Sequence, residues 1–347
     1  MTSKRISSGW RAFSTGQESV YGSPATVTTA LNFEGAPTDI EPNEMQTDEK
    51  EITGFVEATQ HETLNWKLEG HHKQRAMPHN LAIFLGLVMG QVTSDQPDVG
   101  NDPDVYRHYI ERDLVSAAMK SVTLVEFDGV AQKQFPGIFG KSVKISGERG
   151  QFLKLDASFG GMGKEQASAV SKPSTVAESY LRYGDVEFTR GGALSGSVSG
   201  GDLAVGSSPT SFKGVLRSFE YAINAEPVSL YEMGDNTGYV TRAERGERWK
   251  QELSAVFEMA DDTHKTGLIS GSEYVLSIPI TGGVIAGGSG NLNYEAHFIF
   301  PKVVYREAKK AVEGSIVIVN GGFQVLEDAT YGSVIVKIQN KQSSYLV

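Results

Sequence analysis

Short β-type segments recur along almost the whole chain, and this pattern limits the possible folds more than any other feature. Residues 63–68 and 142–145 alternate apolar and polar side chains, which is typical of a strand with one buried face. Other segments combine β-branched and aromatic residues between Gly, Asn and Asp; they are 121–127, 152–155, 217–224, 250–258, 274–280, 294–305, 315–319 and 334–339. Many connections are too short for a crossover helix, so the pattern predicts antiparallel sheets and a mainly β fold. The unbroken apolar run at 316–319 predicts a strand buried on both faces.

One helix is predicted within this pattern. Leu81, Phe84, Leu85 and Val88 have the spacing of one helical face, and Gly90 follows as a stop signal. Asn80 is expected to cap the helix. The residues between these positions are apolar as well, so the helix over 80–89 has to be buried in a core or between subunits. Weaker patterns predict further helices over 105–120 and 263–270.

Composition excludes several classes of protein. The 347 residues include no cysteine, so the chain has no disulfide framework, thiolate metal site or thiol nucleophile. A net charge of −10 argues against tight binding to phosphates, which depends on clustered Lys and Arg. No apolar segment follows the basic residues of the N-terminus, and the longest apolar run, 81–89, is far shorter than the roughly 20 residues that span a bilayer. We therefore expect a soluble chain made in a cytoplasm, with no membrane partner.

The two halves of the chain show the same order of elements. A strand at Trp66 or Trp249 precedes a helix ending in Gly, then a strand, a Phe-Pro pair and a strand pair. Residue identity between the halves is low, so the repeat is architectural. We expect a first domain over 1–165 and a second over 213–347. Residues 166–212, with Gly- and Ser-rich stretches at 170–177 and 191–209, form either a flexible connector or long hairpin loops.

A search for reactive groups finds no convincing site. Residues 158–165 resemble a phosphate-binding loop only faintly, and Glu165 occupies the place of the magnesium-binding hydroxyl. No Gly-x-Ser-x-Gly motif occurs. His71 and His72 are adjacent, so on a strand they point to opposite faces, and no histidine pair has zinc-site spacing. We predict no catalytic residue, no metal and no cofactor.

Several short motifs resemble those of one known family. Residues 17–25, with the sequence QESVYGSPA, resemble the opening of bacteriophage tail tube proteins. In the family's order follow EITG at 51–54, LEG at 68–70 before the helix, and SVTL, FPG and SVKIS between 121 and 146. The C-terminal half carries LRSF at 216–219, FPKVVY at 300–305 and VIVKIQN at 334–340. The order of these motifs, more than any one of them, identifies the resemblance.

The resemblance implies a structural role. It implies β-sandwich or β-barrel domains with a flanking short α-helix, which form rings around a lumen that conducts DNA during ejection. The rings stack into a tube in the virion tail, with the tail terminator, tape measure and tail tip proteins as partners, after synthesis in the host cytoplasm. An acidic lumen would keep DNA from sticking. A carbohydrate- or receptor-binding β-sandwich of the virion and a hydrolase on a β scaffold remain as alternatives.

Two sets of residues are candidate subunit contacts. The apolar helix supplies Leu81, Phe84, Leu85 and Val88. The loop over 226–248 carries charges of both signs and suits a contact with the next ring; its candidates are Glu232, Asp235, Arg242, Glu244 and Arg245.

The number of chains in a ring follows from the repeat. The resemblance implies sixfold symmetry, and a single tube domain needs on the order of 150 residues. Three chains with two domains each supply six units. If the long loops are instead insertions in one domain, six chains close the ring.

Overall fold

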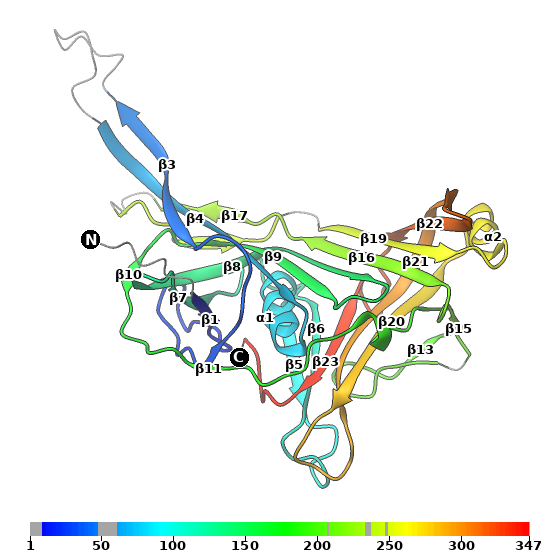
Figure 1. Ribbon diagram of the computed structural model, residues 1–347. Coiled ribbons are helices and arrows are strands. Elements are labelled where there is room, and N and C mark those ends of the chain that lie inside the picture. Colours follow the sequence, from blue (N-terminus) through cyan, green and yellow to red (C-terminus); the bar gives the residue numbers. More distant parts are fainter. Residues whose placement is uncertain (1–8, 48–60, 207, 233–236, 247–248, 347) are drawn as a thin grey trace.

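The computed structural model describes residues 9–47, 61–206, 208–232, 237–246 and 249–346, and it is built mainly of antiparallel strands (Figure 1). One large sheet contains β1 (Trp10–Phe13), β3 (Asp39–Thr47), β4 (His61–Arg75), β5 (Gly90–Asp95), β6 (Tyr106–Arg112), β7 (Val122–Phe127), β8 (Gln132–Glu148), β9 (Lys154–Gly161), β10 (Gln166–Ala167), β12 (Thr189–Arg190), β15 (Thr210–Ser211), β16 (Leu216–Asn224), β19 (Lys250–Glu258), β20 (Tyr274–Val284), β21 (Asn293–Glu313), β22 (Ile316–Val325) and β23 (Ile335–Asn340). Small sheets pair β2 (Thr29–Ala30) with β11 (Ser174–Thr175), β13 (Leu194–Ser195) with β14 (Ala204–Val205), and β17 (Val228–Leu230) with β18 (Arg242–Glu244). The helices are α1 (Pro78–Met89), α2 (Thr263–Ser270) and the 3₁₀ turn η1 (Tyr183–Asp185). The predicted mainly β fold is confirmed.

The long layer across the top of Figure 1 is the main sheet layer of the molecule. Its strands pair in the order β3, β4, β9, β8, β16, β19, β22 and β21. The first part of β8 leaves this layer to pair with β7, and the first part of β21 pairs with β20 and β23. Below the layer, β23 continues into β6 and β5. The folded-back strands enclose a core on one side of the long layer.

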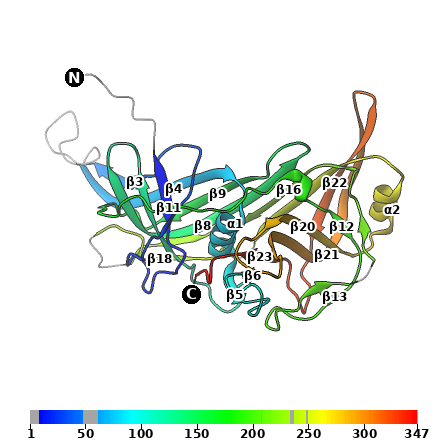
Figure 2. The ribbon, with the colours of Figure 1, turned by 60° about the horizontal axis from the view of Figure 1, so that its bottom comes forward.

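Helix α1 fills that core. All twelve of its residues are buried, and it packs against β5, β6, β8 and β23, as Figure 2 shows at the centre of the molecule. Asn80 is the third helical residue, not the N-cap; its Oδ1 accepts a hydrogen bond from the Met77 amide at 2.9 Å. Gly86 is required by close packing, because a Cβ there would lie 2.7 Å from Leu346 Cδ1. The predicted burial of this helix is confirmed.

Two sequence-based predictions of local structure are wrong. Residues 105–120 do not form a helix, because Tyr106–Arg112 forms strand β6 between β5 and β23. The aromatic and β-branched residues of this segment favour a strand once partners lie on both sides. The run 316–319 is not buried throughout, since Ile316 and Val317 are 43% and 41% exposed near the tip of the β21–β22 hairpin. Helix 263–270 and the other predicted strands are confirmed, with ends that differ by a few residues or extend further.

The two halves share one pattern of strand pairing. In the first half, the strands follow one another along the chain as β3, β4, β7, β8 and β9. Their pairs are β3·β4, β4·β9, β9·β8 and β8·β7. In the second half the pairs are β16·β19, β19·β22, β22·β21 and β21·β20, in the same chain order. Helix α1 packs on β8 and helix α2 on β21. The predicted repeat of elements therefore extends to the pairing of the strands.

Two irregularities of register recur in the same places. The β7·β8 register shifts between the pairs Val122–Ile138 and Leu124–Phe135, and the β20·β21 register between Tyr274–Val303 and Leu276–Phe300. The β8·β9 register shifts between Gly140 and Ser142, and the β21·β22 register between Tyr305 and Glu307. Bulges re-aim a strand and are specific features of a fold. The shared bulges align the halves residue by residue, with Phe135 equivalent to Phe300.

The domain boundaries stay a prediction. Within 166–212, β12 pairs with β20 as β1 pairs with β7. An element of the second repeat thus lies inside the stretch that the sequence assigned to a connector or loops.

A charge at Phe84 tests the buried helix. Phe84 is 1% exposed, so Phe84→Asp places an unpaired carboxylate in the core and should lower the unfolding free energy by several kcal/mol. Ile269→Asp on α2 is the control, because Ile269 is 75% exposed and should change stability by about 0.5 kcal/mol or less. Urea unfolding of the unassembled chain measures both. Equal stability of the two variants would contradict the assigned core.

Candidate assembly surface

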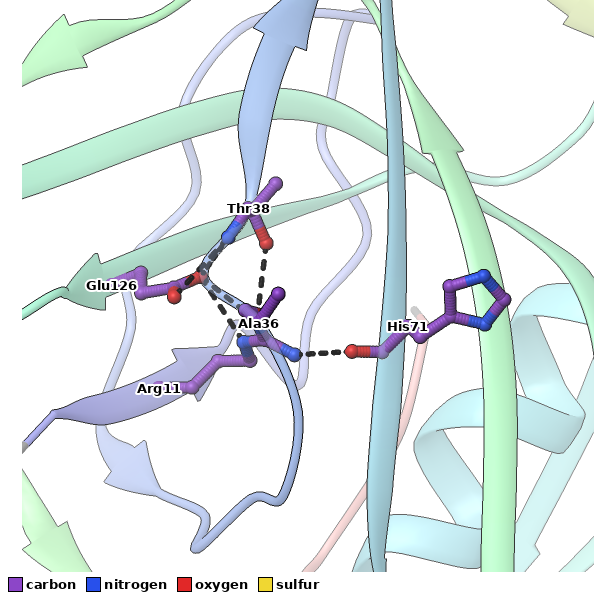
Figure 3. A network of polar contacts seen from close by, with 5 residues as sticks. All are labelled: Arg11, Ala36, Thr38, His71 and Glu126. Atoms are coloured by element: carbon purple, nitrogen blue, oxygen red, sulfur yellow. Dashed lines mark hydrogen bonds and ion pairs between the residues drawn. The ribbon is translucent and has the colours of Figure 1, made fainter.

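A buried arginine holds the segment that leads into edge strand β3. Arg11 faces Glu126 across the β1·β7 pair, and Nε donates to Glu126 Oε2 at 3.1 Å. Its Nη1 donates to the His71 carbonyl at 2.7 Å, and Nη2 donates to the Ala36 carbonyl and to Thr38 Oγ1, both at 3.2 Å (Figure 3). Glu126 in turn accepts from the Thr38 amide. The network joins β1, β4 and β7 to the chain just before β3.

Arg11 and its carboxylate partner are almost completely buried. Arg11 is 0% exposed and Glu126 is 1% exposed. Burial lowers the pKa of Arg11, and the charge of Glu126 opposes that shift. The guanidinium also stacks 4.1 Å from the centre of the Phe33 ring, which adds a cation–π contact. This network fixes the path of the edge strand from inside the molecule.

The face of the long layer that points away from α1 is polar. Its lysines form ion pairs with carboxylates on the same strand or on a strand one or two places away; the pairs are Lys67–Glu41 at 3.7 Å, Lys73–Asp156 at 3.2 Å, Lys141–Glu69 at 2.7 Å, Lys144–Glu220 at 2.7 Å and Lys309–Glu307 at 3.0 Å. Ser142 and Ser158 lie between them and share a hydrogen bond. A shallow hollow of about 650 Å³ lies over the β8·β16 pair and is lined by Ser146, Glu148, Lys154 and Arg217 among others. Five lysines on this face are therefore paired with carboxylates, whereas the exposed Lys154 forms no ion pair with another described residue.

The loop over 226–248 folds back onto the first half of the chain. Tyr231 Oη donates to the Trp66 carbonyl at 3.0 Å, and the Val240 amide donates to the Met162 carbonyl at 3.0 Å. Glu232 is exposed, while Asp235 lies outside the described residues. Arg242 and Glu244 belong to β18 and form an ion pair at 3.4 Å.

Arg245, by contrast, is an internal contact. Its side chain is 6% exposed, and its guanidinium donates to the Asp113 carbonyl. Burial lowers the pKa of Arg245, against the opposing charge of Asp113. The predicted role of this loop in contacting the next ring is not tested in a single chain and stays a prediction.

The candidate residues of the helix lie in the core of their own chain. Leu81, Phe84, Leu85 and Val88 are 0–1% exposed. A contact between these side chains and another subunit also stays a prediction. Sequence patterns indicated their burial correctly, but not which elements cover them.

Two strand edges remain open at opposite ends of the long layer (Figure 1). β3 pairs only with β4, and the part of β21 beyond Val303 pairs only with β22, among the described residues. An open edge presents unpaired amide and carbonyl groups and is a template for pairing with another chain. Sequence patterns did not identify these edges, because strand order cannot be read from periodicity.

The histidines of the described part of the chain do not gather into a group that suits a metal ion. No group of three or more His, Cys, Asp or Glu side chains gathers there in a way that suits a metal. His71 and His72 point to opposite faces of β4, as predicted, with His71 exposed and His72 buried. His79 lies in α1 and His108 in β6, and both join a buried network through Tyr345 and Asn340. No helix among the described residues is long and apolar enough to cross a membrane.

Burial favours the neutral form of His72, His79 and His108 in the folded chain. Desolvation lowers the pKa of His72 to about 3 and those of His79 and His108 to about 4. Each group binds its proton more weakly in the folded state than at its unfolded pKa near 6.5. Their contribution to stability is therefore present above that value and is lost as the pH falls toward 4.

The Arg11 network predicts a large loss on breaking one partner. Arg11→Gln leaves Glu126 buried without its counter-charge, which typically costs about 3–5 kcal/mol. Arg306→Gln is the matched control, because Arg306 is exposed and should change stability by about 0.5 kcal/mol or less. Denaturant unfolding measures both variants. A cost for Arg11→Gln below about 1 kcal/mol would contradict the geometry.

A pH series tests the neutral histidines. His72→Phe keeps an aromatic ring beside Phe84, whose ring centre lies 4.9 Å away, and removes one group that must be neutral to fold. The loss of stability between pH 7 and pH 4 should be smaller in this variant than in the parent. His71→Phe, on the exposed face of the same strand, is the matched control for the added ring, because it leaves the buried His72 in place. Identical slopes in His72→Phe and the parent would show that His72 does not titrate as burial implies.

Comparison with known proteins agrees with the fold. No curated protein sequence matches the chain. A family model described as phage tail tube protein matches residues 11–283, which is most of the chain and includes β16 and β19 of the second half of the long layer. The sheet architecture and the motif order are consistent with that match. The chain therefore belongs to the phage tail tube protein family.

Proposed function

We propose that this chain acts as a structural subunit of a phage tail tube in the tail of the virion, because it belongs to the phage tail tube protein family. The family is one of structural proteins and not of enzymes. No observation favours the carbohydrate- or receptor-binding alternative.

We propose that three chains form each ring and supply six similar units. The observation that carries the proposal is the repeat of strand pairing, including both bulges, in the two halves of one chain. The two units already lie side by side, because β8 of the first pairs with β16 of the second. Head-to-tail contacts between open edges at opposite ends generate a closed ring when the rotation closes. Six chains would instead place twelve units around the axis.

In this proposal the polar face of the long layer lines the lumen and DNA passes along it. DNA affinity comes mainly from free lysines and arginines that displace counterions from phosphates. The lysines Lys67, Lys73, Lys144 and Lys309 on this face each have a carboxylate within 4 Å. Paired lysines attract phosphate weakly, so the wall lets DNA slide. The net charge of −10 per chain acts in the same direction.

The charged loop, the apolar helix and the other tail proteins also have proposed roles in assembly. Glu232, with Asp235, Arg242 and Glu244, forms the charged loop that we propose for contact with the next ring. Leu81, Phe84, Leu85 and Val88 act on assembly through the strands that they support, such as β8 and β6. The tail terminator, tape measure and tail tip proteins are the proposed partners at the tube ends and in the lumen, with assembly in the host cytoplasm.

The mass of one isolated ring tests the stoichiometry. Three chains of 37.5 kDa should give a ring of about 112 kDa by native mass spectrometry. A ring of twice that mass would show that six chains close it and would contradict the proposed use of the repeat. Monomers that form neither rings nor tubes at any concentration would count against the tube function itself.

A further inference from the structure

The contact between the two halves of one chain is a template for the contact between two chains. β8 and β16 pair without interruption from Ser142–Asn224 to Glu148–Ser218. On the core side, Ile145 faces Tyr221 and Val143 faces Ile223, and all four are at most 2% exposed. On the polar side, Lys144 faces Ala222 and forms an ion pair with Glu220 at 2.7 Å. We call this pairing the internal seam.

The repeat identifies which residues would occupy the same positions between chains. The bulge in β8 lies between Gly140 and Ser142, and the bulge in β21 lies between Tyr305 and Glu307. Ser142 is therefore equivalent to Glu307, and Lys144 to Lys309.

The other strand of the seam aligns in the same way. Glu41 faces Lys67 in β3·β4, and Asn224 faces Lys250 in β16·β19. Trp66 directly precedes Lys67 as Trp249 directly precedes Lys250. Asn224 is therefore equivalent to Glu41, and Ala222 to Asp39.

We infer that β21 of one chain pairs with β3 of a second copy in the register of the internal seam, so that Lys309 faces Asp39. This inference rests on the proposed function only in one respect: it requires that one copy of the chain contacts another. It does not depend on the number of chains in a ring. Both edges are open among the described residues, and they lie at opposite ends of the layer. The pairing would supply main-chain hydrogen-bond partners to both strands, which is the basis of strand addition. In the single chain the Ile40 amide of β3 donates to Asp39 Oδ1 at 2.9 Å, so this one group would exchange a side-chain partner for the second chain.

The side chains at the two edges fit this register on both faces. Lys309 is 74% exposed and Asp39 is exposed, so opposite charges meet on the polar face. Glu307 and Glu41 also meet there, but each already has a lysine within 4 Å. On the other face, Ala308 meets the half-buried Ile40, and Val312, which is 72% exposed, meets Ala36. Hydrogen bonds from Arg11 to the Ala36 carbonyl and to Thr38 Oγ1 fix the position of this segment.

The seam between chains differs from the internal seam in one respect. The internal seam buries Ile145 against Tyr221, whereas the equivalent positions between chains are Lys310 and Thr38. One charged side chain, Lys310, and one neutral polar side chain, Thr38, therefore replace part of the apolar contact. Ring closure should weaken as salt concentration rises, while the internal seam should not, because screening acts mainly on exposed charges.

Disulfide cross-linking tests the register directly. The chain has no cysteine, so the double variant Asp39→Cys, Lys309→Cys introduces the only two thiols. Directly opposed residues on neighbouring strands have Cα atoms about 4.5–5.5 Å apart, within reach of a disulfide. Oxidised tubes should give a ladder of covalent dimers and trimers on a non-reducing gel. The control Asp39→Cys, Glu313→Cys places the second thiol further along the same face of β21 and should give no ladder.

The outcomes separate this inference from the tube function. Tubes that form but cross-link in neither variant, or equally in both, would overturn the register and leave the tube subunit intact. A ladder that ends at six chains would support the strand pairing and reject the three-chain ring.

Charge reversal provides an independent check. Asp39→Lys and Lys309→Glu should each raise the protein concentration needed for assembly roughly tenfold or more, since like charges then face each other. The double variant should restore assembly. Lys154→Glu, at an exposed lysine on β9 away from both edges, should assemble as the parent does. If the double variant assembles no better than the single variants, Asp39 and Lys309 do not face each other.

Discussion

The unbroken pairing of β8 with β16 is the interaction on which the rest of the structure depends. It joins two similar sets of strands into one long layer through main-chain hydrogen bonds and a row of buried side chains. Because each set contributes one strand to this pairing, one edge of each remains open, at β3 and at β21. The internal pairing thus determines where, and in which direction, a second chain can continue the sheet.

The two faces of the long layer differ in the side chains that they carry. The inner face holds a core that is closed by α1, by the folded-back strands β5, β6 and β23, and by Tyr345 and Leu346 near the C-terminus. The polar face carries serines and paired charges, and in the ring that we propose it lines the lumen. The two helices also differ in burial between the two halves of the chain. α1 is covered on all sides, whereas α2 lies at the outer end of the molecule with only His264 and Gly267 buried (Figure 2).

Sequence patterns predicted the local elements well and the long-range contacts poorly. Alternation and β-branched content located most strands, and the Trp and Phe-Pro landmarks located the repeat, because Phe135 and Phe300 occupy equivalent strand positions. Residues 105–120 were misjudged because their strand depends on β23, far away in the sequence. Arg245 was expected on a contact surface, but its burial depends on the distant Asp113. The role of Arg11 was missed as well. An arginine between apolar residues of a strand is a signal of a buried ion pair, yet nothing in the sequence names Glu126 as its partner.

The symmetry of the assembled tube tests the central claim most directly. A reconstruction from electron cryomicroscopy, calculated without imposed symmetry, should show six lobes around the lumen with true threefold symmetry. Alternate lobes should differ, since α1 is enclosed and α2 is exposed. Neighbouring lobes should join through strands of one continuous sheet, alternately within a chain and between chains. Twelve lobes, or six identical lobes formed by six chains, would contradict the account.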